Sequence, residues 1–155
     1  MSKSLKRVIT ALQNAGSNSQ PVEIGQATTA QMAADLVGCH VDQIAKSIIF
    51  RGETSNAAVL FVTAGGNQVS AERARLLAGE PLGNADATLI RAQTGIAIGG
   101  VSPVGHLTQP RAVFDPRLCD FDQVWAAAGT PRHVFGIAPD ELLRISGASK
   151  ASFTV

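Results

Sequence analysis

The sequence is poor in aromatic residues and has no dominant charge. It contains no tyrosine, one tryptophan and six phenylalanines among 155 residues, which is too few for a protein that stacks successive bases of a single strand on aromatic side chains. Thirteen lysines and arginines nearly balance 12 aspartates and glutamates, so no broad basic surface for duplex DNA is expected. DNA is therefore not an expected partner, and any nucleic-acid contact should be local.

Cysteines and long hydrophobic runs are also scarce. Cys39 and Cys119 are the two cysteines, and neither lies in a zinc or redox motif, so both are expected to be free thiols. No apolar run approaches the length of a membrane span, and the first ten residues lack the apolar core of a signal peptide. We therefore expect a cytoplasmic protein with no membrane partner.

The residues that are present suit a single domain spanning 1–155, because 45% of them are hydrophobic and a chain of this length can bury a substantial core. Apolar periodicity and capping residues predict helices at about 4–15, 28–37, 70–78, 86–94 and 139–146. The expected N-caps of the first four are Ser4, Thr28, Ser70 and Asp86. Strands are predicted at 21–24, 44–51, 57–63, 112–114 and 133–137, with 44–51 and 57–63 paired as a hairpin. Residues 123–129 fit a strand or a helix, and the following Gly-Thr-Pro favours a strand. Since strands and helices mix without a regular βαβ alternation, we expect an α+β fold with a mixed or largely antiparallel sheet.

The stretch from Gly95 to His106 combines an apolar segment, which reads as a strand, with several glycines and a proline. Glycine allows positive φ and close approach of a ligand, whereas proline fixes φ and removes a donor. Gly99, Gly100 and Pro103 therefore indicate either a loop that contacts a ligand or a simple transition from strand to loop.

Lys46 lies within the predicted strand 44–51, on the same face as Ile44, Ile48 and Phe50. One interpretation is an edge-strand lysine whose stem reaches water and protects the edge. The other is a lysine that points into a pocket, where it could hold a phosphate or an ester carbonyl. The residue pattern alone leaves both open.

Motifs for metals, cofactors and nucleotides are absent. The three histidines lack metal-ligand spacing, and no Gly-x-Gly-x-x-Gly or Gly-x-x-x-x-Gly-Lys-Ser/Thr motif occurs. Ser102 is not in a Gly-x-Ser-x-Gly context and has no base assigned to it. We therefore expect no metal and no cofactor, and a hydrolytic triad could arise only by spatial convergence.

Four segments together resemble the YbaK/aminoacyl-tRNA deacylase family, which includes the editing domain inserted in bacterial prolyl-tRNA synthetases and its free-standing relatives. The segments are Thr28-Thr29-Ala30 with the following helix, Gln43 to Phe50, Gly99 to His106, and Ala128 to Pro131 with Pro139 to Leu143. The most specific parts are the lysine of Gln-Ile-x-Lys-Ser and the Gly-x-x-x-Pro pattern at 99–103. The resemblance covers the chain from about Val8 to Gly147.

This resemblance implies a strongly curved mixed sheet and metal-free hydrolysis of the ester that joins a wrong amino acid to the 3′ end of a tRNA. The implied partners are the acceptor end of an aminoacyl-tRNA and a prolyl-tRNA synthetase. Lys46 would hold the terminal adenosine or its phosphate, and Gly99, Gly100 and Val101 would present backbone groups to the aminoacyl end. Pro103 would hold the shape of that loop.

The resemblance also implies substrate contacts for four further residues, namely Thr28, Ser47, Ser102 and His133. Ser47 stands where some alanine-specific relatives have asparagine, so the cysteine-specific and broader small-residue subgroups remain open. Two alternatives to a tRNA deacylase also remain: a module that binds a nucleotide or aminoacyl end without turnover, and a hydrolase of small esters.

Overall fold

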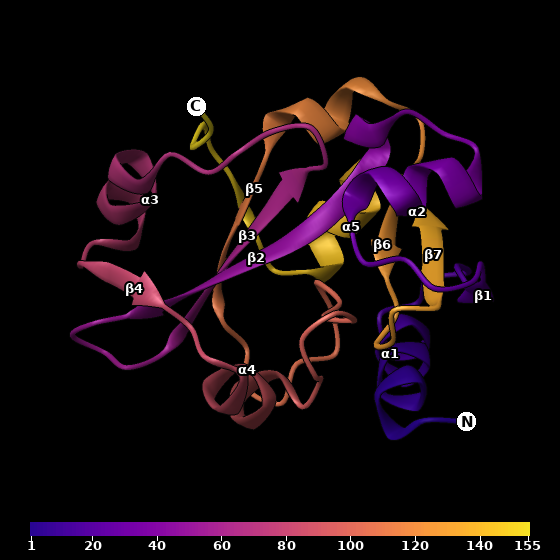
Figure 1. Ribbon diagram of the computed structural model, residues 1–155, viewed down its shortest axis with the longest axis horizontal. Helices are drawn as coiled ribbons and strands as arrows, with labels where there is room; N and C mark the ends of the chain where they lie inside the picture. The colour runs from indigo at the N-terminus through magenta and orange to yellow at the C-terminus, as the bar shows by residue number, and fades with distance from the viewer.

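The computed structural model describes residues 1–155 and has an α+β fold with one eight-stranded mixed sheet and five α-helices (Figure 1), as predicted. The helices are α1 (Lys3–Asn14), α2 (Ala30–Val37), α3 (Ala71–Ala78), α4 (Ala87–Thr94) and α5 (Pro139–Ile145). The strands are β1 (Val22–Glu23), β2 (Ile44–Gly52), β3 (Ala58–Ala64), β4 (Leu82–Asn84), β5 (Arg111–Phe114), β6 (Val124–Ala127), β7 (His133–Ile137) and β8 (Ser149–Lys150). Two 3₁₀ turns, η1 (Val41–Gln43) and η2 (Pro116–Asp120), complete the elements. None of the helices has the length and apolarity needed to cross a membrane.

The strand order is β1-β7-β6-β2-β3-β5-β8, and β4 pairs with the end of β2 outside this path. β2 and β3 form the predicted antiparallel hairpin, the longest ladder of the sheet, and run diagonally through the molecule in Figure 1. β6 and β7 form a second antiparallel pair and join β2 through a short parallel contact. The ambiguous segment 123–129 therefore contains a strand.

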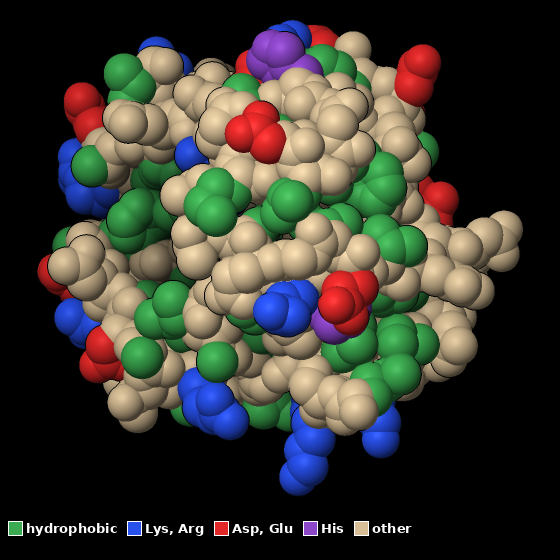
Figure 2. Space-filling model, turned by 45° about the vertical axis from the view of Figure 1, so that its right-hand side comes forward, with side chains coloured by type: hydrophobic (Ala, Val, Ile, Leu, Met, Phe, Trp, Pro, Cys, Tyr) green, Lys and Arg blue, Asp and Glu red, His purple; other side chains and the backbone are tan.

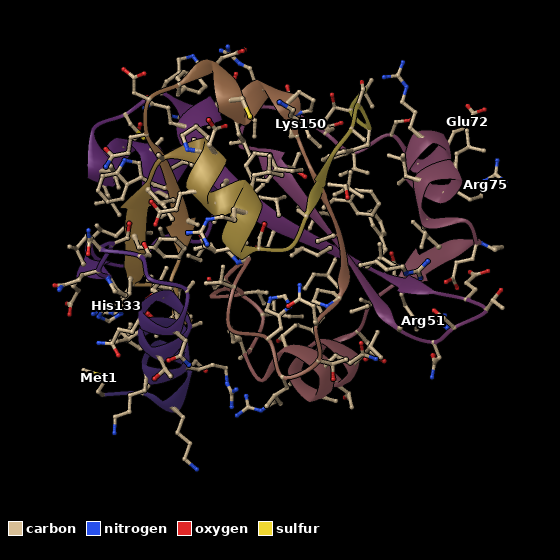
Figure 3. The ribbon with its side chains drawn as sticks, turned by 180° about the vertical axis from the view of Figure 1, so that it is seen from behind. Met1, Arg51, Glu72, Arg75, His133 and Lys150 are labelled. Atoms are coloured by element: carbon tan, nitrogen blue, oxygen red, sulfur yellow. The ribbon has the colours of Figure 1, made fainter.

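Helices cover both faces of the sheet. α2 lies in front of it in Figure 1, and α5 lies in front of it when the molecule is seen from behind in Figure 3. Every residue of β3 is buried. This explains why its sequence is apolar except for Thr63, because a strand covered on both faces has no need of polar alternation. The two cysteines are free, as predicted, and pack against two of the hydrophobic clusters.

The N-termini of two helices differ from the expected positions. Helix α1 is capped by Ser2 instead of Ser4, and α2 is capped by Thr29 instead of Thr28. In both cases the chosen hydroxyl is the one that reaches the backbone N–H three residues later, at 3.0 and 3.1 Å, and this bond defines the cap. The predicted N-caps of α3 and α4 are confirmed.

The expected strand at the start of the glycine-rich stretch is wrong. Gly95 ends α4 in the left-handed conformation, with φ of 78°, and the Ile96 N–H donates to Thr94 Oγ1 at 3.0 Å. These two features turn the chain away from the extended conformation, so the apolar side chain of Ile96 is buried by a loop. The segment therefore forms an irregular loop, which contacts the turn between β6 and β7 at Gly100 and packs against α1 at Gly105.

Candidate active site

The sheet opens between β2 and β6, and this opening forms the candidate site. The two strands pair in parallel at only two positions, Ile44 with Trp125 and Ala45 with Ala126. Beyond them β2 continues along β3, whereas β6 ends and the chain turns into β7. A cavity of about 350 Å³ lies at the opening, at the small end of the range of roughly 300–1,000 Å³ that is usual for small-molecule sites.

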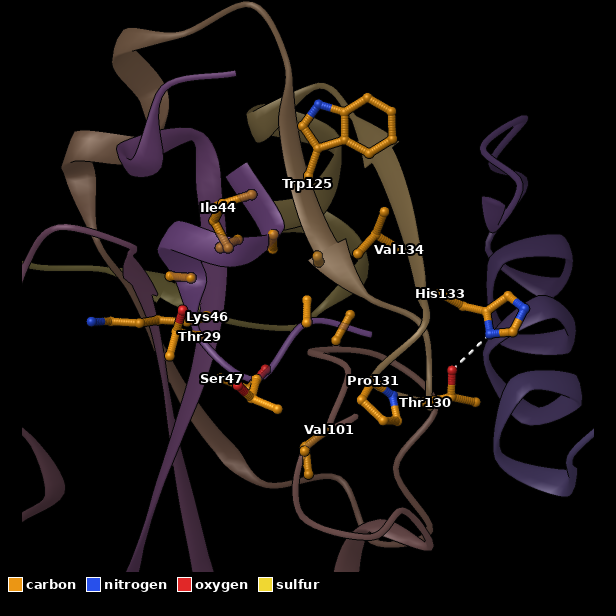
Figure 4. Close-up of a pocket in the computed structure, with 18 residues that line it drawn as sticks. Thr29, Ile44, Lys46, Ser47, Val101, Trp125, Thr130, Pro131, His133 and Val134 are labelled. Carbon is orange, nitrogen blue, oxygen red and sulfur yellow. Dashed lines mark hydrogen bonds between the residues drawn. The ribbon is translucent and has the colours of Figure 1, made fainter. Parts of the chain in front are cut away.

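Small side chains make up much of the cavity wall. The alanines that line it are Ala27, Ala30, Ala33, Ala45, Ala126 and Ala127. Ile44 and Trp125 lie at one end of the site in Figure 4, and Val101 and Pro131 lie at the other. The wall therefore leaves space for a small apolar group beside the polar side chains that also line the cavity.

Part of the main chain of β2 faces this opening without a partner strand. The Gly52 N–H donates to the Ala57 carbonyl at 2.8 Å, and bonded pairs alternate in an antiparallel ladder. Every second residue from Gly52, including Lys46, therefore exchanges its backbone bonds with β3. The backbone N–H and C=O groups of Ser47 and Ile49 point to the other edge of β2. β6 covers this edge only at the start of β2, and β4 covers it only at the end of β2.

The side chain of Ser47 is also without a partner. Its Oγ is buried, makes no hydrogen bond and belongs to a residue that lines the cavity. A buried polar group left unpaired costs about 1–3 kcal/mol, so such groups are rare in native structures and call for a specific reason. Ser47 therefore combines an unpaired hydroxyl with an unpaired backbone edge at the opening.

Lys46 lines the cavity and is held by a neighbouring turn. Its Nζ donates to the carbonyls of Gly65 at 3.1 Å and Asn67 at 2.7 Å. Figure 4 shows the side chain extending away from Val101 and Pro131. Because an ammonium group has three donors, one N–H remains for another acceptor.

Two carboxylates fix the turn that holds Lys46. Asp115 accepts a hydrogen bond from Asn67 Nδ2 at 3.0 Å, and Asp42 accepts one from the Gly66 N–H at 2.9 Å. Burial lowers the pKa of Lys46, and the negative charges of Asp115 and Asp42 partly oppose this. The two carboxylates thus place the carbonyls that bind Lys46 and help to keep its ammonium charged.

The loop at 99–101 supplies free backbone donors. Gly99 has φ of 102° and lines the cavity together with Val101. The N–H groups of Gly99 and Val101 donate to no acceptor within the protein, whereas the Gly100 N–H donates to the Ala97 carbonyl at 3.3 Å. The N–H groups of Gly99 and Val101 are therefore available to a ligand at this wall, and the N–H of Gly100 is not.

Three of the predicted site residues, Gly100, Ser102 and Pro103, do not line the cavity. All three are buried. Gly100 packs against the main chain of Thr130, and Ser102 Oγ accepts the Val104 N–H at 3.3 Å. These three residues therefore support the shape of the loop and do not line the opening.

His133 belongs to the wall, but its ring projects toward α1, on the side of β7 away from Lys46 (Figure 4). His133 Nδ1 lies 2.7 Å from Thr130 Oγ1, which also accepts the Arg132 N–H at 3.1 Å. His133 Nε2 lies 3.6 Å from a carboxylate oxygen of Glu23. The ring thus fixes the turn that carries Thr130 into the cavity wall.

Six of the nine predicted site residues come together at the cavity: Thr28, Lys46, Ser47, Gly99, Val101 and His133. The sequence reasoning did not select Thr29, Trp125, Thr130 or Pro131, which also line it. The Thr-Pro turn and the single tryptophan were the available signals, but neither carries a chemical motif. No group of three or more His, Cys, Asp or Glu side chains is placed to hold a metal ion.

Comparison with known proteins finds relatives that are similar in sequence. The model of the aminoacyl-tRNA editing domain family matches residues 25–145, a span that includes every residue lining the cavity. The uncharacterized protein YwhH of Bacillus subtilis is 32% identical over 118 residues, covering 76% of this chain and 74% of YwhH.

Solved structures resemble the whole molecule. The crystal structure of a candidate trans-editing enzyme for prolyl-tRNA synthetase has a TM-score of 0.93 and 43% identity, covering 100% of this chain and 99% of that one. The hypothetical protein APE2540 has a TM-score of 0.87 and 24% identity, covering 96% of this chain and 99% of its own, and supports the fold alone. The predicted resemblance is confirmed, and the chain belongs to the aminoacyl-tRNA editing domain family.

Proposed function

We propose that the protein is a trans-editing deacylase, which hydrolyses the ester between a wrongly attached small amino acid and the 3′ end of a tRNA. The proposed substrates are proline tRNAs that carry cysteine, alanine or a similar small residue. It would act in the cytoplasm, alone or with prolyl-tRNA synthetase. The observation that carries the proposal is the alanine-walled cavity whose lining includes Gly99 and Val101, with free N–H groups, and Ser47, with its unpaired backbone edge.

The polar groups around the cavity suit an aminoacyl ester. The carbonyl and hydroxyl of Ser47 can accept hydrogen bonds from an α-amino group, and its N–H can donate to an oxygen of the ester. The remaining N–H of Lys46 can donate to a phosphate or carbonyl oxygen of the terminal nucleotide. These contacts orient the ester, and positioning alone contributes substantially to the rate of a reaction that is already favourable.

Hydrolysis needs no protein nucleophile. A water molecule attacks the ester carbonyl carbon, and the carbonyl oxygen becomes an oxyanion that the N–H groups of Gly99 and Val101 stabilise. The bond from carbon to the ribose oxygen then breaks. The ribose oxygen takes a proton from the attacking water, through the neighbouring ribose hydroxyl, and a free amino acid and a tRNA with a free 3′ end are released.

Selectivity in this site would rest on size. One missing methylene in an apolar pocket is worth only about 1–3 kcal/mol of binding, so attraction alone discriminates poorly between small residues. Steric exclusion of a larger residue is more effective. The short alanine side chains and the turn at Thr130 and Pro131 would set the upper limit on the amino acid that enters.

The test is release of free amino acid from proline tRNAs charged with cysteine, alanine, serine or proline. The protein should release at least one small residue and leave the prolyl ester intact. Competition by uncharged tRNA should slow the reaction, since a hydrolase of small esters would be indifferent to it. Saturable binding without release from any of these substrates would overturn the deacylase proposal and favour a binding module.

A further inference from the structure

The exposed face of α1 carries an uncompensated positive charge. Lys3, Lys6 and Arg7 lie on this helix, and the chain contains no acidic residue before Glu23. None of the three cations takes part in an ion pair. Figure 2 shows Lys and Arg side chains projecting from the lower edge of the face that includes α1, with no Asp or Glu side chain among them.

These cations border a groove of about 440 Å³ that is distinct from the candidate active site. Its lining, with a single hydrophobic residue, consists of Lys3, Lys6, Arg7, Thr10, Ala11, Asn14, Gly105 and His106. The residues from α1 recur every three or four positions, so they form one continuous face of the helix. A polar groove with several cations and further side-chain donors suits an anionic backbone better than an apolar ligand.

The helix that lines the groove packs against a turn of the active-site wall. Gly129 lies directly against α1, because a Cβ atom there would be 2.6 Å from the Ser4 carbonyl group. Its neighbour in the chain, Thr130, lines the active-site cavity. Helix α1 thus lines the groove with one face and packs, through the Ser4 backbone, against the turn that carries Thr130 into the cavity wall.

We propose that this face of α1 is a docking surface for the phosphodiester backbone of the tRNA acceptor stem. The inference rests on the proposed function for its choice of RNA. A cavity of about 350 Å³ can take only the aminoacyl end, so the stem must lie on the outside of the protein. The lysines would contact phosphates without reading sequence, which explains how one short helix can serve a protein whose overall charge is close to neutral.

The experiment measures binding of an uncharged acceptor-stem hairpin that ends in CCA, over a range of salt concentrations. The variant K3Q/K6Q removes two exposed charges from α1 and keeps good helix formers. The control R75Q/K150Q removes the same charge from exposed residues, which lie away from the Met1 end of the molecule in Figure 3. We expect K3Q/K6Q to bind roughly tenfold more weakly, with a salt slope smaller by about two, and the control to bind like the wild type.

A second measurement separates this inference from the proposed function. The K3Q/K6Q change should lower kcat/KM for an aminoacyl-tRNA but leave it unchanged for an aminoacylated CCA trinucleotide, which has no stem. If the protein binds the hairpin through these lysines but hydrolyses neither substrate, the docking surface stands and the deacylase proposal fails. Equal hairpin affinity in K3Q/K6Q and wild type, or an equal loss in the control, would overturn the docking surface.

Discussion

Gly100 lies so close to Thr130 that a Cβ atom on Gly100 would be 2.5 Å from the Thr130 Cα and backbone nitrogen. The Gly100 carbonyl also accepts the Gly129 N–H at 2.9 Å. This contact joins two segments that are about 30 residues apart in the sequence, and each of them supplies a wall of the cavity. The position of the Gly99 and Val101 donors relative to Thr130 therefore depends on the absence of a side chain at residue 100.

The first prediction is that Gly100→Ala damages both stability and activity. The added methyl group must push the Thr130 backbone away, and overpacking of this kind costs about 1–3 kcal/mol of unfolding free energy. We expect the separated walls to lower kcat/KM for deacylation by more than tenfold. Urea denaturation and single-turnover deacylation measure the two effects.

The control for this change is Gly79→Ala. Gly79 ends α3 with φ of 73° and has no heavy atom within 4 Å of an added Cβ, so the substitution costs about 1–2 kcal/mol through backbone strain alone. It lies outside the cavity lining, and its kcat/KM should stay at the wild-type value. If the two variants lost activity equally, the contact between residues 100 and 130 would have no specific role.

The sequence was sufficient for features that depend on local chemistry. The hairpin of β2 and β3 follows from its apolar strands and polar turn, and the ends of α3 and α4 follow from their caps. The assignment of the Gly-rich loop and Lys46 to one site came instead from the family resemblance, because the residue pattern alone left both interpretations of each open. The roles within that loop were not predictable, because only the packing against Thr130 makes Gly100 a contact glycine and leaves Gly99 facing the cavity.

The second prediction concerns the unpaired hydroxyl of Ser47. Ser47→Ala removes a buried group with no hydrogen-bond partner, so the free protein should lose nothing and gain about 1 kcal/mol of unfolding free energy. If the hydroxyl binds the substrate, kcat/KM should fall by roughly tenfold, which corresponds to about 1.4 kcal/mol.

Thermal unfolding and deacylation kinetics test these opposite effects in the same variant. Ser149→Ala is a matched control, since Ser149 is exposed on β8 and should change neither quantity. Unchanged kinetics in Ser47→Ala, together with the gain in stability, would show that the hydroxyl makes no contact with the reacting substrate.

The third prediction is that the charge of Lys46 is needed for activity. Lys46→Met keeps the apolar stem but removes the donors to the Gly65 and Asn67 carbonyls, so unfolding free energy should fall by about 1–3 kcal/mol. Loss of the remaining N–H and its charge should lower kcat/KM by roughly 10²-fold or more. Lys46→Arg retains the charge and should recover part of this loss.

The pH profile distinguishes a charge that acts on the substrate from one that only holds the turn. Burial lowers the pKa of Lys46 from 10.5, so the ammonium loses its proton at a lower pH than an ordinary lysine. After correction for uncatalysed hydrolysis, wild-type kcat/KM should decline as the pH rises, and this alkaline limb of the profile should have its midpoint below pH 10.5. In Lys46→Arg the same limb should move to higher pH. An identical limb in both proteins would contradict a role for the ammonium in the reaction.

The fourth prediction concerns stability in acid and a carboxylate remote from the cavity. Glu80 Oε1 accepts the backbone N–H groups of Thr54 and Ser55, each at 2.9 Å, and Glu80 also pairs with Arg111. The pKa of Glu80 is lowered from 4.5 to about 2. The hydrogen bond from the Ser55 N–H is the largest cause, and the Arg111 side chain and the Thr54 N–H also contribute. These bonds fix the turn between β2 and β3.

A carboxyl whose pKa is lower in the folded state binds fewer protons there than in the unfolded chain. Its contribution to stability is therefore complete above pH 4.5, and is lost as the pH falls from 4.5 toward 2. Glu80→Gln should remove this part of the pH dependence, so that the variant is less stable than the wild type at pH 6 and the difference narrows at pH 2. Urea denaturation at pH values from 2 to 6 measures this difference in stability.

Glu72→Gln is the control, because the Glu72 carboxylate forms no hydrogen bond or ion pair. If the difference in stability between Glu80→Gln and the wild type stayed constant down to pH 2, the assignment of the lowered pKa to Glu80 would be contradicted.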